Sequence, residues 1–437
     1  MVALNYIYFL IITLTGLYFL YSSRHIVLHP YNKQLHLKLS GPEMFWILTF
    51  STGLLSLSAP AGLNLMAVRL LVLELFCTIG LFITRNKAIW TPTSIIYLLY
   101  ILWLVIGLFY SPAPAYGIRV ILKYLYPFVV MLFASAVVRD GELFLKSSLG
   151  ARKVALFSLI FVVFPVIEQT LFVGVFWYAT AKAIHYIAIG SFSLALYFYG
   201  TKSKKELFIT ILFIIPCIIW VFRTSILGTT VAIMTFFFIR YRLRSLPIIG
   251  VVSLLFVVSI FAVPSIRDKM FFESKNKSIE QLQEGEISKD DINSNGRFAM
   301  WEWALDKFYT NKELAGSGTG TLQETFYSLR HPFGHMKICH NDYVQILSDN
   351  GLIGIFLFGT SFLILIIHSF IVCQQKKYPW YIHVAAITAG SSAAGMLFTL
   401  YTDNGINYSM ATVSYPCGFY GMMLGLIAGY KTKNNTN

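Results

Sequence analysis

Long apolar stretches recur along almost the whole chain. A bilayer core about 30 Å thick is crossed by a helix of about 20 apolar residues, and most of these stretches approach that length. They do not alternate apolar with polar positions, as the strands of a membrane barrel do. The pattern predicts an all-α polytopic membrane protein with about 12 or 13 transmembrane helices. The apolar stretches lie near residues 2–21, 44–58, 63–83, 93–110, 118–138, 153–175, 183–200, 208–222, 226–239, 246–263, 351–373, 379–400 and 412–430.

The distribution of charge orients these helices. Of the 437 residues, 57% are apolar and only 12% are charged, whereas about a quarter of the residues in a soluble domain are charged. Lys and Arg cluster in every second connection, which marks those connections as cytoplasmic. The net charge of +14 is therefore a topology signal, and we expect no nucleic-acid partner. The basic clusters are Arg24, Lys33 and Lys38; Arg85 and Lys87; Arg139, Lys146, Arg152 and Lys153; Lys202, Lys204 and Lys205; Arg240, Arg242 and Arg244; Lys376 and Lys377; and Lys431 and Lys433.

The same alternation places one long hydrophilic segment, residues 264–350, on the outer side of the membrane. The short connections that hold Arg119, Arg223 and residues 401–409 fall on that side too. A connection this long in a compact protein usually carries function, so we expect an outward-facing site. The predicted organisation is an N-terminal transmembrane bundle over residues 1–263, the large loop over residues 264–350, and C-terminal transmembrane helices with a cytoplasmic tail over residues 351–437.

The second half of the large loop contains a predicted amphipathic helix. The run RFAMWEWALDKFY follows the helix-start residues of NSNG and repeats apolar residues at a spacing of three and four. This helix can lie on the membrane surface or against the bundle. Arg297 stands in its first turn, where exposed N–H groups already favour an anion. Arg297 is either an ordinary surface residue or part of an anion site.

Two further features of the loop are ambiguous. The glycines of GSGTG, Gly316 to Gly320, could let backbone N–H groups approach a phosphate, but no Walker ending follows, and a flexible turn is the favoured interpretation. His331, His335 and His340 could suggest a metal site. Their spacing is broken by Pro and Gly, and no zinc-binding pattern accompanies them. We therefore predict no metal site and interpret the first two as solvated loop residues.

His340 differs in its context. It precedes a short predicted helix, DYVQILSD, that ends at the Asp-Asn-Gly of residues 349–351, next to the bilayer edge. An imidazole can accept or donate a proton at neutral pH. A single His is weak evidence, but this one begins a longer pattern. His340 and Asn341 are followed by nine residues and then by Gly351-Leu352-Ile353-Gly354.

This pattern resembles the H-N-x9-G-x-x-G signature of the O-antigen ligase and O-antigen polymerase superfamily, in which Ser or Gln can replace the Asn. These are bacterial membrane glycosyltransferases that use polyprenyl-pyrophosphate-linked sugars. The resemblance extends over most of the chain, because the large loop precedes the signature and further helices follow it. Three more segments resemble family features: Phe222-Arg223-Thr224-Ser225, the N-G-R-x-x-x-W run from Asn295 to Trp301, and the Gly316 to Gly320 turn.

The resemblance implies a glycosyltransferase type C fold in the bacterial inner membrane, with the active site facing the periplasm. It implies an inverting transfer without metal or cofactor, from a polyprenyl-pyrophosphate-linked oligosaccharide to a lipid-linked glycan or to lipid A core. His340 would be the general base. The lipid bilayer surrounds such an enzyme, and a chain-length regulator protein is a further partner that the resemblance suggests. The residues expected to bind pyrophosphate or sugar are Arg223, Arg297, Arg119, Arg330 and Asn341.

Three outer-side residues, Arg119, Lys123 and Asp403, have alternative interpretations. Arg119 and Lys123 form an i, i+4 pair at the start of a span, and extension of their charged ends toward the interface would explain both. We favour a substrate contact for Arg119 and not for Lys123. Asp403, the acid in the last outer connection, could orient a base or a sugar, or cap a turn. The turn is the favoured interpretation.

Within the superfamily we favour an O-antigen polymerase, because polymerases are more numerous and diverse across surface-polysaccharide loci. Three other functions compete with it. A ligase would use the same donor chemistry and transfer the finished chain to lipid A core. A lipid-linked oligosaccharide flippase or transporter would carry charges at the centres of several helices and internal repeats. Most spans of this sequence lack a charge at their centre, and we detect no internal repeat. A purely structural membrane protein would leave the pattern around His340 unexplained.

Overall fold

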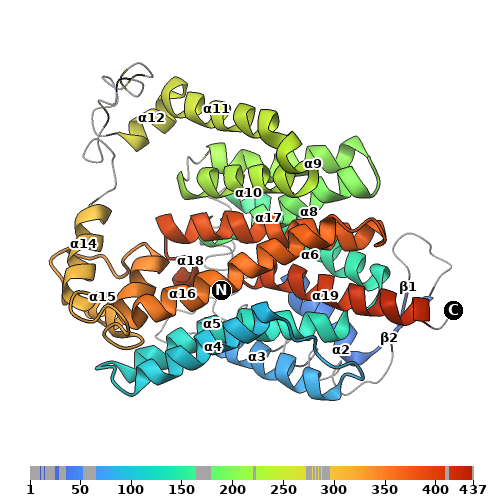
Figure 1. The fold of residues 1–437 in the computed structure, drawn as a ribbon, viewed down its shortest axis with the longest axis horizontal. Helices are drawn as coiled ribbons and strands as arrows, with labels where there is room; N and C mark the ends of the chain where they lie inside the picture. Colours follow the sequence, from blue (N-terminus) through green and yellow to red (C-terminus); the bar gives the residue numbers. More distant parts are fainter. Residues whose placement is uncertain are drawn as a thin grey trace.

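The computed structural model of the chain describes residues 25–28, 36–52, 65–163, 179–219, 223–271, 296–408 and 413–435, with a few isolated residues between them (Figure 1). Helices account for most of these residues. The described helices are α2 (Gly41–Thr52), α3 (Leu65–Ile83), α4 (Pro92–Leu108), α5 (Pro114–Val137), α6 (Gly141–Val163), α8 (Ala179–Tyr199), α9 (Lys204–Ile219), α10 (Arg223–Tyr241), the 3-10 helix η1 (Arg242–Ser245), α11 (Leu246–Ala262), α12 (Pro264–Met270), α14 (Arg297–Phe308), α15 (Thr321–Tyr327), α16 (Asp342–Cys373), α17 (Trp380–Thr402), α18 (Gly405–Tyr408) and α19 (Ser414–Asn435).

The predicted all-α polytopic class is confirmed. Every predicted span from residue 44 onward overlaps a helix, although parts of some spans, such as residues 53–58 and 164–175, fall outside the described residues. The first predicted span, residues 2–21, lies almost entirely outside them. Four described helical stretches are long and apolar enough to cross a membrane, and three shorter apolar helices accompany them. The structure also shows a short antiparallel hairpin, β1 (His25–Leu28) and β2 (His36–Leu39), in the first basic connection, with His25 opposite Leu39.

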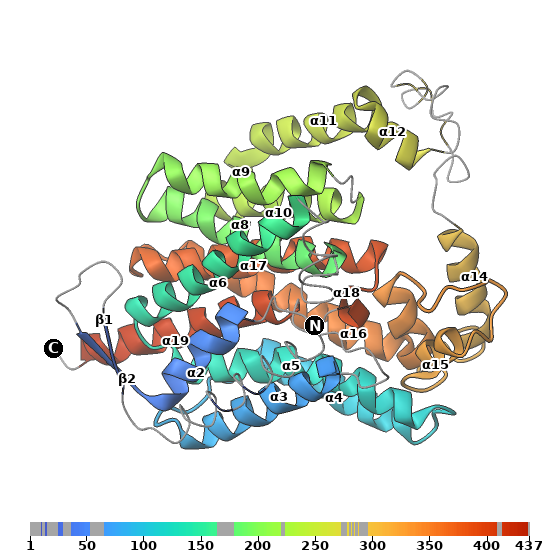
Figure 2. The same cartoon turned by 180° about the vertical axis from the view of Figure 1, so that it is seen from behind.

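Helices α5 and α17 form the centre of the bundle. In each helix, 83% of an apolar 18-residue stretch is buried. In the corresponding stretch within residues 225–262 the buried share is 11%, so that stretch faces outward. Helix α17 packs against α8 and α10 on one side and against α16 and α19 on the other. Both views of the ribbon show this layered order (Figure 1, Figure 2). The buried apolar side chains of these layers form one continuous core.

Three glycines on α19 let it approach α5 very closely. Gly421, Gly425 and Gly429 recur every four residues and therefore share one side of the helix. A Cβ atom built at Gly421 would overlap the backbone carbonyl oxygen of Met131 in α5. One built at Gly425 would overlap that of Val138, the residue that follows α5. Small residues in such a row permit tight helix contacts inside a membrane, where packing rather than hydrophobic transfer drives association.

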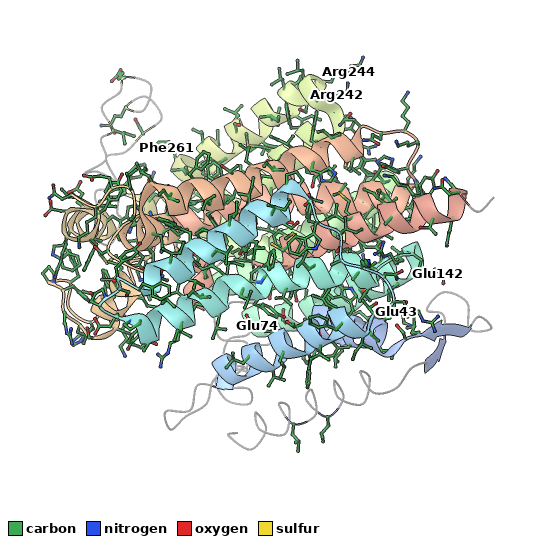
Figure 3. The ribbon with its side chains drawn as sticks, turned by 60° about the horizontal axis from the view of Figure 1, so that its bottom comes forward. Glu43, Glu74, Glu142, Arg242, Arg244 and Phe261 are labelled. Atoms are coloured by element: carbon green, nitrogen blue, oxygen red, sulfur yellow. The ribbon has the colours of Figure 1, made fainter. Side chains whose placement is uncertain are left out.

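The basic connections gather at one end of the bundle. The Arg139 guanidinium donates to the Lys87 carbonyl oxygen at 2.7 Å, and the Tyr430 hydroxyl donates to the Lys377 carbonyl oxygen at 2.9 Å. Figure 3 shows Arg242 and Arg244 toward this same end, and Phe261, at the far end of α11, toward the other. The segregation agrees with the predicted alternation. We refer to the opposite end, which carries residues 296–341, as the loop end.

Helix α14 confirms the predicted amphipathic helix, and it packs against the bundle. Met300, Ala304 and Phe308 are buried in a small cluster with residues of α15 and the start of α16, while Trp301 and Leu305 lie at its edge. The buried face is therefore rotated slightly from the face that the spacing predicts, which consists of Phe298, Trp301, Leu305 and Phe308. The loop contributes a packed subdomain at the loop end, on the left in Figure 1.

The glycine row on α19 gives a test of the packing. Gly425→Ala should lower the free energy of unfolding by about 1–3 kcal/mol, because the added methyl group has no space beside the Val138 carbonyl oxygen. Thermal unfolding of the detergent-solubilised protein measures the effect. Gly250→Ala is the matched control, since nothing lies within 4 Å of a Cβ atom built there. Equal unfolding temperatures for the two variants would contradict this account of the contact.

Candidate functional site

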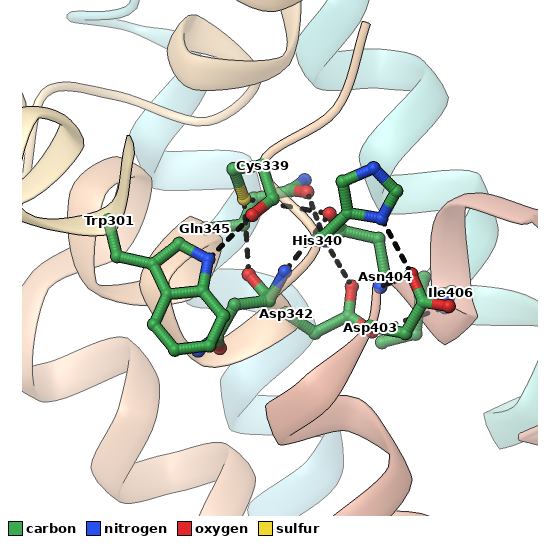
Figure 4. Close-up of polar contacts among 9 residues, drawn as sticks. Trp301, Cys339, His340, Asp342, Gln345, Asp403, Asn404 and Ile406 are labelled. Atoms are coloured by element: carbon green, nitrogen blue, oxygen red, sulfur yellow. Dashed lines mark hydrogen bonds and ion pairs between the residues drawn. The ribbon is translucent and has the colours of Figure 1, made fainter. Parts of the chain in front are cut away.

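The backbone at His340 has an unusual conformation. Its φ is +53°, in the left-handed region that few residues other than glycine adopt. Hydrogen bonds fix the residues on both sides. The Trp301 indole N–H donates to the Cys339 carbonyl oxygen at 2.7 Å, and the Asn341 backbone N–H donates to the side-chain oxygen of Asn404 at 3.2 Å (Figure 4). Helix α14 and the connection after α17 therefore hold the segment in place together.

The His340 side chain is paired with Asp403. Its Nδ1 lies 3.0 Å from a carboxylate oxygen of Asp403, which also accepts the Asn404 backbone N–H at 2.8 Å (Figure 4). The His side chain is 19% exposed and the Asp side chain 7%. A carboxylate at Nδ1 favours the tautomer with its proton on that nitrogen and the lone pair on Nε2. The pair is thus built to accept a proton at Nε2. The sequence favoured a turn cap for Asp403; its carboxylate instead contacts the imidazole and accepts the N–H of the next residue.

Behind this pair lies a buried polar cluster that sequence reasoning missed. The Asn404 side-chain N–H₂ donates to the Asp342 carboxylate at 3.0 Å and to the Gln345 side-chain oxygen at 3.3 Å. The other Asp342 oxygen accepts the Ile406 backbone N–H at 3.3 Å. All three polar side chains are buried. The cluster joins the first turn of α16 to the connection after α17. The sequence does not reveal this contact because the two segments are far apart in the chain; His340 and Asp403 are separated by 63 residues.

Lys123 supplies a positive charge to this cluster. The sequence suggested that its side chain extends toward the membrane interface, but it is only 6% exposed and points into the bundle. It attracts the Asp342 carboxylate electrostatically. A buried carboxylate is stable when hydrogen bonds and an opposite charge replace its lost hydration. Lys123 therefore acts on this cluster through its charge.

Cys339 and Asn341 have structural roles beside the base. Burial raises the pKa of the Cys339 thiol to about 12, so the thiol stays protonated and is no nucleophile at neutral pH. The Asn341 side-chain oxygen caps α16 by accepting the backbone N–H groups of Tyr343 at 2.9 Å and Val344 at 3.1 Å. A contact between Asn341 and substrate stays a prediction.

The Gly316 to Gly320 turn is not a flexible turn, as the sequence had suggested; it is docked on the end of the signature segment. The Asp349 carboxylate accepts the backbone N–H groups of Gly320 at 3.0 Å and Leu322 at 2.8 Å, at the start of α15. The Asn350 side chain donates to the Thr319 hydroxyl at 2.7 Å. Each of the five backbone N–H groups of the turn has a protein acceptor, so none is left to bind a phosphate.

Only glycine fits three positions of this turn. Gly316, Gly318 and Gly320 have φ values of +71°, +100° and +89°. A Cβ atom at Gly316 would lie 2.5 Å from the backbone of Asp349, and one at Gly318 would lie 2.5 Å from Ser111. The alternate glycines therefore serve close backbone packing and positive φ angles together.

Gly351 is where the two parts of α16 meet. Its φ of 62° and ψ of −163° interrupt the helix, and the freed N–H groups of Leu352 and Ile353 donate to the carbonyl oxygens of Glu313 at 2.7 Å and Leu314 at 3.2 Å. The nine residues between Asn341 and Gly351 span about 15 Å of helix. This spacing sets the distance between the His340 segment and the place where the loop docks.

The predicted arginines lie in different surroundings. Arg297 is half-buried at the start of α14, on the side that carries Trp301 and so faces the His340 segment. Arg119 is exposed above the Tyr116 ring, and Arg330 is exposed in a surface ion pair with Glu324 at 3.6 Å. Their contacts with substrate stay predictions.

Arg223 begins α10, and its side chain lies outside the described part of the structure. Five residues later, Gly228 packs against Gly395 and Thr399 of α17, near the end that leads to Asp403. The backbone of Arg223 is therefore at the loop end.

Two of the loop histidines differ from His340 in their surroundings. His331 is half-buried, and both of its ring nitrogens hydrogen-bond the loop backbone: Nε2 to the Met336 carbonyl at 2.7 Å and Nδ1 to the Phe333 N–H at 3.1 Å. His331 is therefore a structural residue and not the solvated residue that we expected, whereas His335 is exposed.

The O-antigen ligase family model matches residues 208–359 of the chain. The matched region runs from α9 into α16 and includes Arg223, Arg297, the glycine turn, His340 and Gly351. Asp403 and Asn404 lie beyond it. No curated protein matches the chain.

The docking of the glycine turn on Asp349 can be tested by Asp349→Ala. The change leaves two buried N–H groups without their acceptor, at about 1–3 kcal/mol each. We expect faster cleavage within residues 296–341 in limited proteolysis, with the other connections cleaved as before. Asp306→Ala, which removes an exposed carboxylate of α14, is the control and should leave the cleavage rate unchanged. An unchanged rate in Asp349→Ala would show that other contacts hold the turn.

Proposed function

Because the chain belongs to the O-antigen ligase and polymerase superfamily, we propose that it polymerises polyprenyl-pyrophosphate-linked oligosaccharide repeat units at the periplasmic face of the inner membrane. The observation that carries the proposal is the His340 to Asp403 pair at 3.0 Å, held at the loop end beside α14. An oriented imidazole is suited to remove the proton from an acceptor hydroxyl.

In the proposed reaction, the acceptor hydroxyl oxygen attacks the anomeric carbon of the donor from the face opposite the leaving group. The new bond to the acceptor oxygen forms as the bond to the pyrophosphate oxygen breaks, so the configuration inverts. Polyprenyl pyrophosphate leaves with the electron pair, and the hydroxyl proton passes to Nε2 of His340. The Asp403 carboxylate then stabilises the imidazolium that results.

The positive charge for the leaving group comes from arginine in this proposal. Arg297 lies on the side of α14 that faces the His340 segment, and Arg223 begins α10 at the same end. A guanidinium binds phosphate oxygens through charge-assisted and bidentate hydrogen bonds, and fixed cations stabilise the charge that develops on a leaving group. Arg119, Arg330 and Asn341 are proposed as further donor or sugar contacts.

A ligase that transfers the finished chain to lipid A core is the second candidate. It is favoured by the description of the matching family model, O-antigen ligase. Both functions require the same donor and the same base, and they differ only in the acceptor. A chain-length regulator would be a partner of the polymerase.

The choice of acceptor decides between the two. Purified protein in nanodiscs is given the lipid-linked repeat unit together with either a second lipid-linked unit or lipid A core, in buffer that contains EDTA. We expect a ladder of longer lipid-linked chains in both mixtures, because the repeat unit itself carries an acceptor hydroxyl, and no glycan joined to lipid A core. Product on lipid A core alone would establish the ligase, and loss of activity in EDTA would contradict the metal-independent mechanism.

His340→Ala should lower the rate of transfer by about 10²–10⁴-fold, because the acceptor hydroxyl loses its base. Asp403→Asn should also lower kcat, because the amide N–H₂ favours the imidazole tautomer without a lone pair on Nε2. KM for the donor should change little in both, since neither residue is proposed to bind pyrophosphate. Initial rates over a range of donor concentrations separate the two parameters. His335→Ala, an exposed loop histidine, is the control; normal kcat in His340→Ala would refute the assignment.

A further inference from the structure

Two tyrosines and an arginine form a cluster at the surface of the loop end, in which Tyr116 is half-buried. The rings of Tyr116 and Tyr327 lie 6.0 Å apart at 47°, and the Arg119 guanidinium lies 5.0 Å from the centre of the Tyr116 ring. Tyr327 is 49% exposed, and Arg119 is exposed beside it. The cluster joins α5 of the bundle to α15 of the loop. Neither tyrosine has a role in the proposed proton transfer or in the binding of the pyrophosphate.

Tight backbone contacts fix the two halves of the cluster relative to each other. A Cβ atom built at Gly320, just before α15, would overlap the backbone of Gly117 in α5. The Ser111 hydroxyl donates to the Thr319 carbonyl oxygen at 2.9 Å. Phe326, the neighbour of Tyr327, is only 1% exposed and packs in the cluster that contains Cys339. The Tyr327 ring is thus held outward on a rigid support.

The interfacial aromatic belt of membrane proteins does not account for this arrangement. Belt residues lie at the ends of membrane-spanning helices, and Tyr116 alone fits that description. Tyr327 belongs to a seven-residue helix of the loop, α15. An exposed aromatic ring with a fixed position and a polar edge is instead a common element of binding sites.

The chemistry of the cluster suits a sugar ring. The face of a tyrosine packs against the C–H groups on one face of a pyranose, while the phenol and guanidinium groups can hydrogen-bond the hydroxyls around the ring. Tyrosine has few rotatable bonds, so little conformational entropy is lost on binding. The Arg119 charge would additionally favour a sugar that carries a carboxylate.

The cluster is connected to the candidate base along one side of α5. Tyr116, Arg119 and Lys123 are spaced by three and four residues and so lie on the same side of the helix. Lys123 attracts Asp342, which bonds Asn404 in the support of the His340 segment. This side of α5 therefore links the cluster at the surface to the buried support of the His340 segment.

We infer that Tyr116, Arg119 and Tyr327 form a saccharide subsite, which binds a sugar of the oligosaccharide at a distance from the reacting bond. The inference rests on the proposed function, because it places the subsite on the glycan that the enzyme extends. Binding at the subsite needs neither the lipid nor the pyrophosphate. It can therefore be measured apart from catalysis.

The experiment uses the full chain in nanodiscs and the oligosaccharide released by mild acid from the surface polysaccharide of the cells that carry the gene. Saturation-transfer NMR reports binding of this lipid-free probe. We expect binding by the wild type and by His340→Ala, and about a three- to tenfold weaker affinity in the double variant Tyr116→Ala/Tyr327→Ala. Tyr327→Phe should bind nearly normally, because it keeps the ring.

Phe109→Ala is the matched control, since Phe109 is an aromatic residue 88% exposed at the end of α4, near the loop end. It should leave binding unchanged, and an equal loss there would assign the effect to membrane anchoring and overturn the inference. No binding by a wild type that still transfers glycan would also overturn it and leave the proposed function intact. Binding in the wild type without any transfer would instead contradict the proposed function.

Discussion

The docking of the glycine turn on the Asp349 to Gly351 segment is the contact on which the site depends. Together with the contacts of Gly320 with Gly117 and of Ser111 with Thr319, it joins residues 296–341 to the bundle. The Asp349 carboxylate satisfies two buried backbone N–H groups, and the positive φ angles of the glycines allow backbones to touch. Because a buried N–H group without an acceptor is unfavourable, the loop is held in one orientation. Arg297 and Trp301 are thereby carried to the side of the bundle where His340 lies.

A second constraint is the hydrogen bonding of polar groups in an apolar protein. Asp342, Gln345 and Asn404 are buried, and each has a partner of matching chemistry. A fully satisfied buried network fixes geometry, whereas a partly satisfied one is strongly destabilising. The cluster therefore specifies where the connection after α17 crosses the start of α16. That crossing brings Asp403 to His340 and holds the backbone of His340 in its left-handed conformation.

Much of the fold could be predicted from the sequence. Apolar length and loop charge determine which segments are helices and which ends share a side, because transfer into a bilayer depends on composition alone. The helix from Arg297 to Phe308 also followed from local spacing, whereas attention to the segment after His340 came from the resemblance to the family. The partner of His340 did not follow, because Asp403 lies 63 residues away and its local sequence suggests only a turn. Lys123 was misplaced for the same reason, since a charge near a helix end is usually turned toward water.

The sequence by itself thus determined the helices, their order, the sidedness expected for each connection, and the motif that contains the candidate base. The tertiary structure decided which polar groups meet: Asp403 with His340, Asn404 with Asp342, and the glycine turn with Asp349. The physical reason is the range of the interactions. Hydrophobic periodicity and helix capping act within a few residues, so a short stretch of sequence is enough to recognise them. Hydrogen bonds between distant segments depend on how the helices pack, and one glycine or one buried carboxylate in the right place is enough to fix them.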